Sequence, residues 1–65
     1  MKINKTDRLD AFDLDGKIIA TFDADAHGIN CDLRALLAYP DMARAKITTR
    51  RGAWRIINRA AIAAL

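Results

Sequence analysis

Residues 49–65 constrain the fold most, because their apolar residues repeat with the period of a helix. The apolar arc of that helix holds Ala53, Trp54, Ile56, Ile57, Ala60, Ala61, Ala64 and Leu65. The opposite arc holds Arg51, Arg55, Asn58 and Arg59, and Ile62 falls on the wrong side. We therefore predict a helix over residues 49–65, with Trp54 in the core and an arginine stripe facing outward. The alternative is a second β-hairpin, KITTR–RG–AWRII, which the long helical period disfavours.

Asp15-Gly16 stands between two runs in which apolar and polar residues alternate, which is a strong hairpin signal. In the second run, alternation sends Ile18, Ala20, Phe22 and Ala24 to one face and Ile19, Thr21, Asp23 and Asp25 to the other. A three-residue loop with a left-handed Gly16 places Phe12 opposite Ile18. A two-residue loop shifts that register, and the sequence leaves both possibilities open.

The middle of the chain predicts a second helix. Asn30 suits an N-cap and Asp32 suits the first turn of a helix that starts at Cys31. Its buried stripe is Leu33, Leu36 and Leu37, and Pro40 ends it near Tyr39. Residues 41–45 are predicted as one more helical turn and residues 46–48 as a short extended link.

These elements predict a single small α+β domain over residues 1–65, a β-hairpin followed by two helices (ββαα), with residues 1–7 loosely ordered. One cysteine excludes an internal disulfide framework. No apolar run is long enough to span a membrane, so we expect a cytoplasmic protein, as a monomer or homodimer.

The net charge of +3 is unevenly distributed. Residues 1–41 hold all eight acids, every one an Asp, against five bases, whereas residues 42–65 hold six bases and no acid. Such asymmetry indicates contact with nucleic acid or a charged partner. The alternative is that the two halves pair with each other across the fold.

Residues 12–16, Phe-Asp-Leu-Asp-Gly, resemble the first motif of the haloacid-dehalogenase phosphatases. That resemblance implies Asp13 as nucleophile and Asp15 as general acid/base. The chain departs from the family at Lys17, where the family has Thr, and 65 residues cannot supply the large α/β domain that the chemistry needs. A hairpin turn and a protein without catalytic activity are therefore expected.

The segment that starts at Asp23 begins like a calcium-binding EF-hand loop, with Asp25 and Gly28 in place. His27 and Arg34 stand where that loop needs oxygen ligands. A structural zinc site needs four ligands, and the chain has one His and one Cys. No metal or cofactor is expected.

Two charged surfaces are candidate binding sites. The first is an acidic strip along the hairpin that could imitate a line of phosphates, made of Asp10, Asp13, Asp23 and Asp25. The second is the basic stripe of the predicted C-terminal helix, Arg51, Arg55 and Arg59, which resembles a phosphate-contacting helix.

In size and charge layout the chain resembles the small single-domain anti-CRISPR proteins of phages and other mobile elements. That resemblance implies a non-catalytic inhibitor that docks on a nucleic-acid-handling complex, for example a CRISPR surveillance complex, through one of the two charged surfaces. The alternative is a small DNA-binding regulator that uses the basic C-terminal helix. Its affinity should fall steeply with salt.

Overall fold

The computed structural model describes residues 8–23, 29–49 and 51–65. Its elements, in chain order, are the strands β1 (Arg8–Phe12) and β2 (Ile18–Asp23), the helix α1 (Ile29–Ala35), the 3₁₀ turn η1 (Leu36–Ala38), the strands β3 (Arg44–Thr48) and β4 (Trp54–Asn58), and the helix α2 (Arg59–Ala63). The predicted α+β class is confirmed. The predicted order ββαα holds only roughly. The structure has four strands, and a second hairpin stands between the two helices. Residues 1–7, predicted as loosely ordered, lie outside the described residues.

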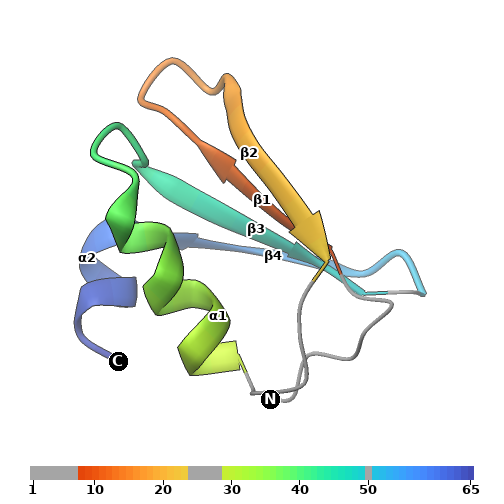
Figure 1. The fold of residues 1–65 in the computed structure, drawn as a ribbon. Helices are drawn as coiled ribbons and strands as arrows, with labels where there is room; N and C mark the ends of the chain where they lie inside the picture. Colours follow the sequence, from red (N-terminus) through yellow and green to blue (C-terminus); the bar gives the residue numbers. More distant parts are fainter. Residues whose placement is uncertain (1–7, 24–28, 50) are drawn as a thin grey trace.

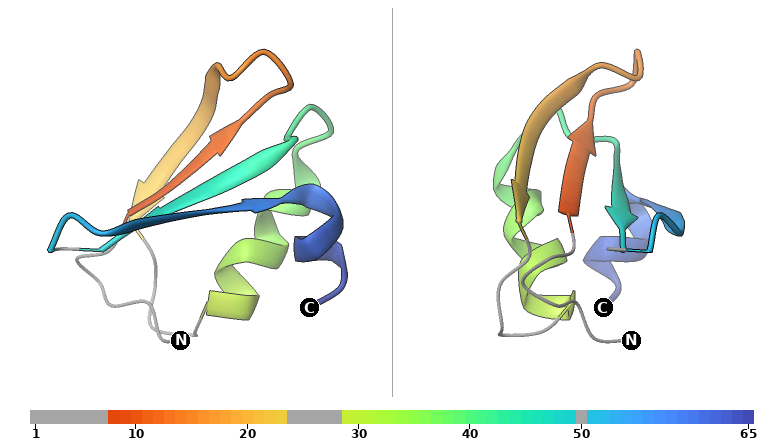
Figure 2. Two further views of the ribbon diagram at one scale, coloured as in Figure 1. Left: turned by 180° about the vertical axis from the view of Figure 1, so that it is seen from behind. Right: turned by 90° about the vertical axis from the view of Figure 1, so that its right-hand side faces the viewer.

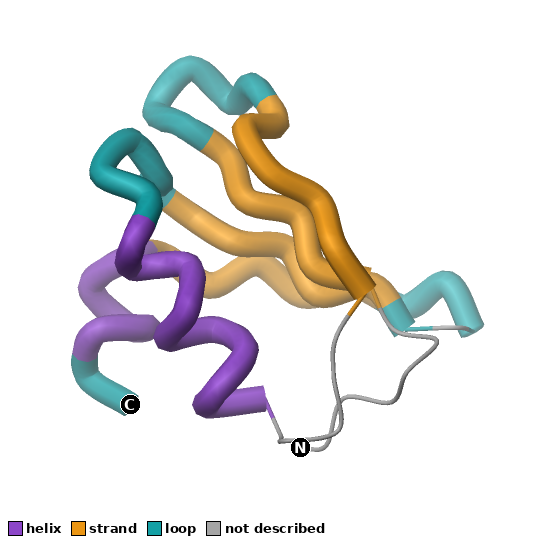
Figure 3. Tube along the Cα trace, in the orientation of Figure 1, coloured by secondary structure: helices purple, strands orange, loops and turns teal. Residues whose placement is uncertain are grey.

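The four strands form one antiparallel sheet in the order β2-β1-β3-β4. Both helices lie on the same face of this twisted sheet, as Figures 1 and 3 show. The view from the side in Figure 2 shows the two layers, with the strands in front and the helices behind them. Within the part of the chain that the structure describes, no helix covers the other face, which we call the open face.

The core fills the space between the sheet and the helices. The sheet contributes Leu9, Ala11, Ala45 and Ile47, and the helical layer contributes Leu33, Leu36, Met42 and Ile62. Because successive strand residues point to opposite faces, the residues between these sheet positions project onto the open face. The predicted stripe is confirmed at the fully buried Leu33 and Leu36 and the half-buried Leu37. The predicted N-cap is wrong, because α1 begins at Ile29 and Asn30 lies inside it.

The Asp15-Gly16 hairpin is confirmed, with the three-residue loop. The Asp13 amide donates to the Lys17 carbonyl over 3.0 Å, the Gly16 amide donates to the Asp13 carbonyl over 3.1 Å, and Gly16 has φ 81°. Phe12 lies opposite Ile18, and the register skips Ile19. This bulge reverses the predicted faces of the two isoleucines, so that Ile19 packs against the core and Ile18 is 48% exposed.

The predicted helix over residues 49–65 is wrong, and the hairpin alternative describes this segment. The Thr49 amide donates to the Ala53 carbonyl over 2.8 Å and the Gly52 amide donates to the Thr49 carbonyl over 2.9 Å. Gly52 has φ 88°, a left-handed conformation incompatible with a continuous helix. The β-branched Ile56 and Ile57 suit the strand that follows. The helix survives only as α2, whose N-cap Asn58 accepts from the Ala61 amide over 2.9 Å.

The predictions for residues 41–45 and 46–48 are also wrong, because the strand β3 of the second hairpin begins at Arg44. Residues 41–45 do not form a helical turn, and Lys46-Ile47-Thr48 is part of an inner strand of the sheet rather than a link. Strand alternation on β4 turns Trp54 away from the helices, so Trp54 is 62% exposed and not in the core. Ile62, which the helical wheel placed on the wrong side, is fully buried. No helix of the described residues has the length and apolar character to cross a membrane.

Candidate functional site

The acidic strip predicted from the sequence is not assembled as an exposed row. Asp10 is on the inner strand β1, and only 5% of the residue is exposed. Its Oδ1 atom accepts hydrogen bonds from Arg8 Nε over 3.0 Å and from Thr21 Oγ1 over 2.7 Å. Asp10 therefore satisfies its charge within the sheet, and the prediction of Asp10 as a phosphate mimic is corrected.

The other three carboxylates of the strip are dispersed. Asp13 lies in the β1–β2 turn, where its Oδ1 atom accepts from the Asp15 and Lys17 amides, each over 2.9 Å. Such a bond pattern stabilises a turn. Asp23 ends β2 and is exposed. Asp25 lies outside the described residues. Among the described members of the strip, only Asp23 is an exposed carboxylate without a hydrogen-bonding role in the fold.

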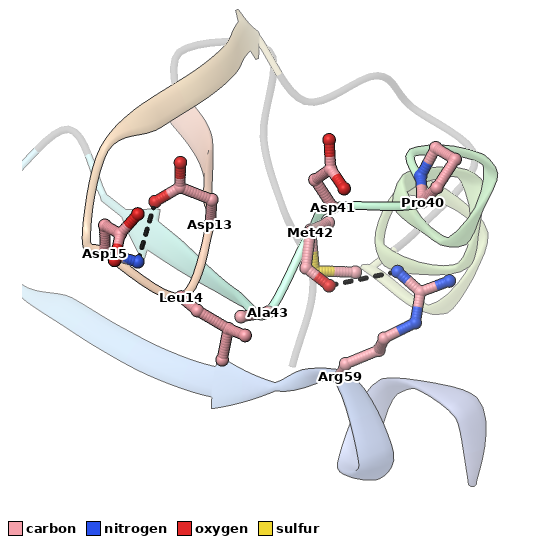
Figure 4. A pocket seen from close by; sticks show the side chains of 8 residues that line it. All are labelled: Asp13, Leu14, Asp15, Pro40, Asp41, Met42, Ala43 and Arg59. Carbon is pink, nitrogen blue, oxygen red and sulfur yellow. Dashed lines mark hydrogen bonds between the residues drawn. The ribbon is translucent and has the colours of Figure 1, made fainter.

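Asp13 and Asp15, the pair that resembles a phosphatase motif, border an open hollow of about 560 Å³. Its walls come from the β1–β2 turn and from the segment before β3: Asp13, Leu14, Asp15, Pro40, Asp41, Met42, Ala43 and Arg59 (Figure 4). The bonds from the Asp15 and Lys17 amides both go to the Oδ1 atom of Asp13 and fix the orientation of its carboxylate in the turn. Within the described residues, no group of three or more His, Cys, Asp or Glu side chains could hold a metal ion.

Arg59 has a structural role that its place in the predicted stripe does not suggest. It begins α2, and its Nη1 atom donates to the carbonyls of Tyr39 over 2.9 Å and of Met42 over 3.0 Å. Its Nη2 atom donates to the carbonyl of Leu37 over 2.9 Å. The guanidinium thus donates to carbonyls at the end of the α1–η1 helical segment and in the turn that follows, where a helix end leaves backbone acceptors in excess. Arg59 is therefore not an outward-facing residue of a basic stripe.

The other two arginines of the stripe lie on separate elements. Arg51 is exposed in the turn between β3 and β4, and Arg55 is exposed on β4. Arg55 is in register with the buried Ile47, so it projects from the same side of the sheet as the helices, at the sheet edge. Because Arg51, Arg55 and Arg59 occupy a turn, a strand and a helix start, they do not form one line.

The structure instead gathers the basic residues on one hairpin. Residues 44–58, which we call the basic hairpin, contain five bases and no acid: Arg44, Lys46, Arg50, Arg51 and Arg55. No ion pair joins the described members of this set to an Asp of the described chain. The two charged halves nevertheless meet in the sheet, because the register places Lys46 beside Asp10, although no ion pair joins these two described residues. The Arg8–Asp10 pair lies within the N-terminal half.

Trp54 lies beside the bases on the open face. The register places Trp54 next to Thr48 and places Ile56 next to Lys46. The Lys46 ammonium lies 5.1 Å from the centroid of the Trp54 ring, within range of a cation–π interaction. Trp54 also borders a hollow of about 200 Å³ at the turn end of the hairpin. Sequence analysis missed this pair, because the helical interpretation put Trp54 inside and left Lys46 in a link.

The open face, the basic hairpin and Trp54 are therefore the features available for recognition. Comparison of the chain with protein-family models, with curated proteins and with solved structures gives no match.

Proposed function

We propose that this chain is a non-catalytic binding protein that contacts nucleic acid through the basic hairpin. The observation that carries the proposal is the set of bases that form no ion pair with an acid among the described residues. Arg44, Arg51 and Arg55 are exposed, Lys46 is half-buried, and residues 42–65 contain no acid. Clustered cations of this kind attract phosphates and release counterions when they bind them.

The internal roles of the carboxylates favour this proposal over a DNA mimic. A mimic needs a row of carboxylates that remain free for the partner. Asp10 is buried and hydrogen-bonded, and Asp13 is held by two amides of its own turn. The basic surface has no comparable internal demand on Arg44, Arg51 or Arg55.

An inhibitor of the anti-CRISPR type is the second candidate, and the exposure of two large apolar side chains favours it. Trp54 is 62% exposed and Ile56 is 50% exposed, both on the open face. Tryptophan and arginine are enriched among the residues that dominate protein–protein contacts. In this version the basic hairpin, rather than the acidic strip, docks on a nucleic-acid-handling complex of the host cytoplasm such as a CRISPR surveillance complex.

Fluorescence anisotropy of labelled DNA and RNA tests the first proposal. We expect binding at about 50 mM salt and an affinity roughly 50-fold (single strand) to 150-fold (duplex) lower at about 200 mM, if about four phosphates are neutralised. Replacing two exposed bases together, as Arg51→Gln and Arg55→Gln, should weaken binding to every sequence, because phosphate contacts carry no sequence information.

Lys17→Gln and Arg34→Gln are the matched controls. Each removes one exposed positive charge, from the β1–β2 turn and from α1 respectively, and neither lies on the basic hairpin. Binding in these variants should stay within about twofold of the wild type. If no nucleic acid binds at the lower salt, direct binding is wrong. Retention of the chain on a CRISPR surveillance complex, lost in the Arg51/Arg55 variant, would then support the inhibitor.

A further inference from the structure

We propose that the open face binds single-stranded nucleic acid, with a base stacked on the ring of Trp54. This inference rests on the function proposed above and adds the kind of nucleic acid, the face and the residues that contact it. The open face is the side of the sheet that neither α1 nor α2 covers, as the view from the side in Figure 2 shows.

The side chain of Trp54 is open to solvent. The residue is 62% exposed although it belongs to a sheet strand, and it contributes nothing to the core. The Lys46 ammonium lies 5.1 Å from the ring centroid, so the face of the indole is in contact with a cation of the neighbouring strand. A surface that accepts a cation can accept the face of a base in its place, and the ammonium is then free to reach a phosphate.

Two basic residues lie on the neighbouring strand β3. Arg44 and Lys46 follow each other on the open face of β3, about 7 Å apart along the strand. They lie in register with Asn58 and Ile56 of β4, and Trp54 is one step further toward the turn that holds Arg51. A backbone that runs along β3 would therefore meet two cations and then an aromatic ring, which is the combination found in single-strand binding surfaces.

A duplex cannot use this surface in the same way. The bases of a duplex are stacked on one another, so none has a face available to the indole. Neither described helix presents a row of exposed bases to a major groove, since α1 carries a single base, Arg34, and α2 is five residues long with Arg59 engaged with backbone carbonyls. Single strands, whose bases can splay apart, satisfy both the cations and the ring.

A second copy of the chain is a poor occupant of the open face. Contact between two such faces would bring together the bases that β3 places on the open face, Arg44 and Lys46, of both copies. Like charges repel each other, and burying them in a contact between two copies costs the free energy of removing them from water. A polyanion removes the same repulsion, and this charge complementarity selects nucleic acid.

Trp54 is the only tryptophan of the chain, so its fluorescence reports directly on the proposed contact. The experiment titrates the protein with a deoxythymidine oligomer of about 12 nucleotides, with a duplex of equal length and with polyglutamate. We expect the single strand to quench Trp54 fluorescence and to bind about tenfold more tightly than the duplex. Equal binding of the duplex or of polyglutamate would overturn the inference.

Variants separate stacking from charge, with anisotropy of the labelled oligomer as the readout. Trp54→Ala should lower affinity about tenfold, and Trp54→Phe should restore most of it, because phenylalanine still offers a ring. Leu65→Ala is the matched control, since Leu65 is an exposed apolar residue that follows α2 on the helical side, 45% exposed, and its loss should leave affinity unchanged. Circular dichroism verifies that each variant is folded.

The outcomes distinguish this inference from the proposed function. If Trp54→Ala binds like the wild type while Arg44→Gln with Lys46→Gln loses affinity, the hairpin binds nucleic acid and the stacking inference is wrong. If no single strand or duplex binds at about 50 mM salt, both are wrong.

Discussion

The two hairpins of this sheet share one turn geometry and differ in how the turn is stabilised. In each, one residue donates its amide to a carbonyl four positions later and accepts from an amide three positions later: Asp13 in the first hairpin and Thr49 in the second. Each turn contains a glycine at positive φ, Gly16 at 81° and Gly52 at 88°. The first hairpin has a side chain that reinforces its turn, whereas no such bond is present at Thr49 in the described residues.

The strands of the two hairpins occupy equivalent places in the sheet. β1 and β3, before the turns, are inner strands with buried residues, whereas β2 and β4, after the turns, are edge strands whose described side chains are exposed or half-buried. The comparison teaches that the same turn can be encoded locally, by Asp13 and Asp-Gly, or can depend on pairing with the rest of the sheet. The second hairpin, which depends on tertiary pairing, is the one that exposes its bases and Trp54.

The largest expected effect is on the element that follows the second hairpin. Ile62→Ala should destabilise the protein by about 2–5 kcal/mol, because Ile62 is the fully buried residue by which α2 joins the core. Urea unfolding followed by circular dichroism measures this free energy. Trp54→Ala is the control and should stay within about 0.5 kcal/mol. The reverse order, with Trp54 costly and Ile62 neutral, would restore the helical interpretation of residues 49–65.

Arg59→Ala should destabilise by about 2–3 kcal/mol, because three carbonyls of the α1–η1 segment and the following turn lose a charged donor. Arg55→Ala, four residues away in the same predicted stripe, should change stability by less than about 0.5 kcal/mol. Thermal unfolding of the two variants measures the difference. Similar values for both would indicate that the two guanidinium groups share one environment, as a helical stripe requires. Arg59→Lys should recover little, since an ammonium lacks the planar fork.

The next effect contrasts the two turns directly. Asp13→Ala should destabilise by about 1–2 kcal/mol, because two backbone amides lose their acceptor. Thr49→Ala, at the matching position of the second turn, should change stability by no more than about 0.5 kcal/mol. Chemical unfolding of both variants provides the comparison. Equal losses would mean that the second turn also has a side-chain reinforcement, and the contrast between local and tertiary encoding would fail.

The smallest effect tests what the turns have in common. Gly16→Ala and Gly52→Ala should each destabilise by about 1 kcal/mol, because a Cβ atom disfavours positive φ. A Cβ atom at either position would meet no other atom within 4 Å, so no steric contact adds to this cost. The two losses should agree within about 0.5 kcal/mol in unfolding experiments. A loss at Gly16 alone would show that the second turn tolerates a different backbone.

Local sequence determined a substantial part of this protein. The Asp-Gly turn, the Leu33 and Leu36 stripe and the end of the helical segment before Pro40 depend on neighbours a few residues apart, and each is present. The charge asymmetry is likewise a property of the sequence, and five of the six bases in residues 42–65 lie in the basic hairpin. The α+β class follows from these elements.

The tertiary structure decided the C-terminal segment. Residues 54–58 do not alternate cleanly, because Ile57 packs against the core while Trp54 and Ile56 lie on the open face. An apolar residue on each side of a strand removes the two-residue period, and the remaining pattern imitates a helix. Pairing with β3 favours a strand here. The backbone N–H and C=O groups along the free side of β3 need hydrogen-bond partners, and β4 provides them.

Contacts between residues distant in sequence also determined which charged residues belong to the candidate site. Arg59 contacts carbonyls 17 to 22 positions earlier in the chain, which no local pattern indicates. Asp10 is withdrawn from the surface because β1 lies between two other strands, a position that the sequence of β1 does not specify. The sequence by itself therefore determined which charges the chain carries, and the pairing of strands distant in sequence determined which of them remain available to a partner.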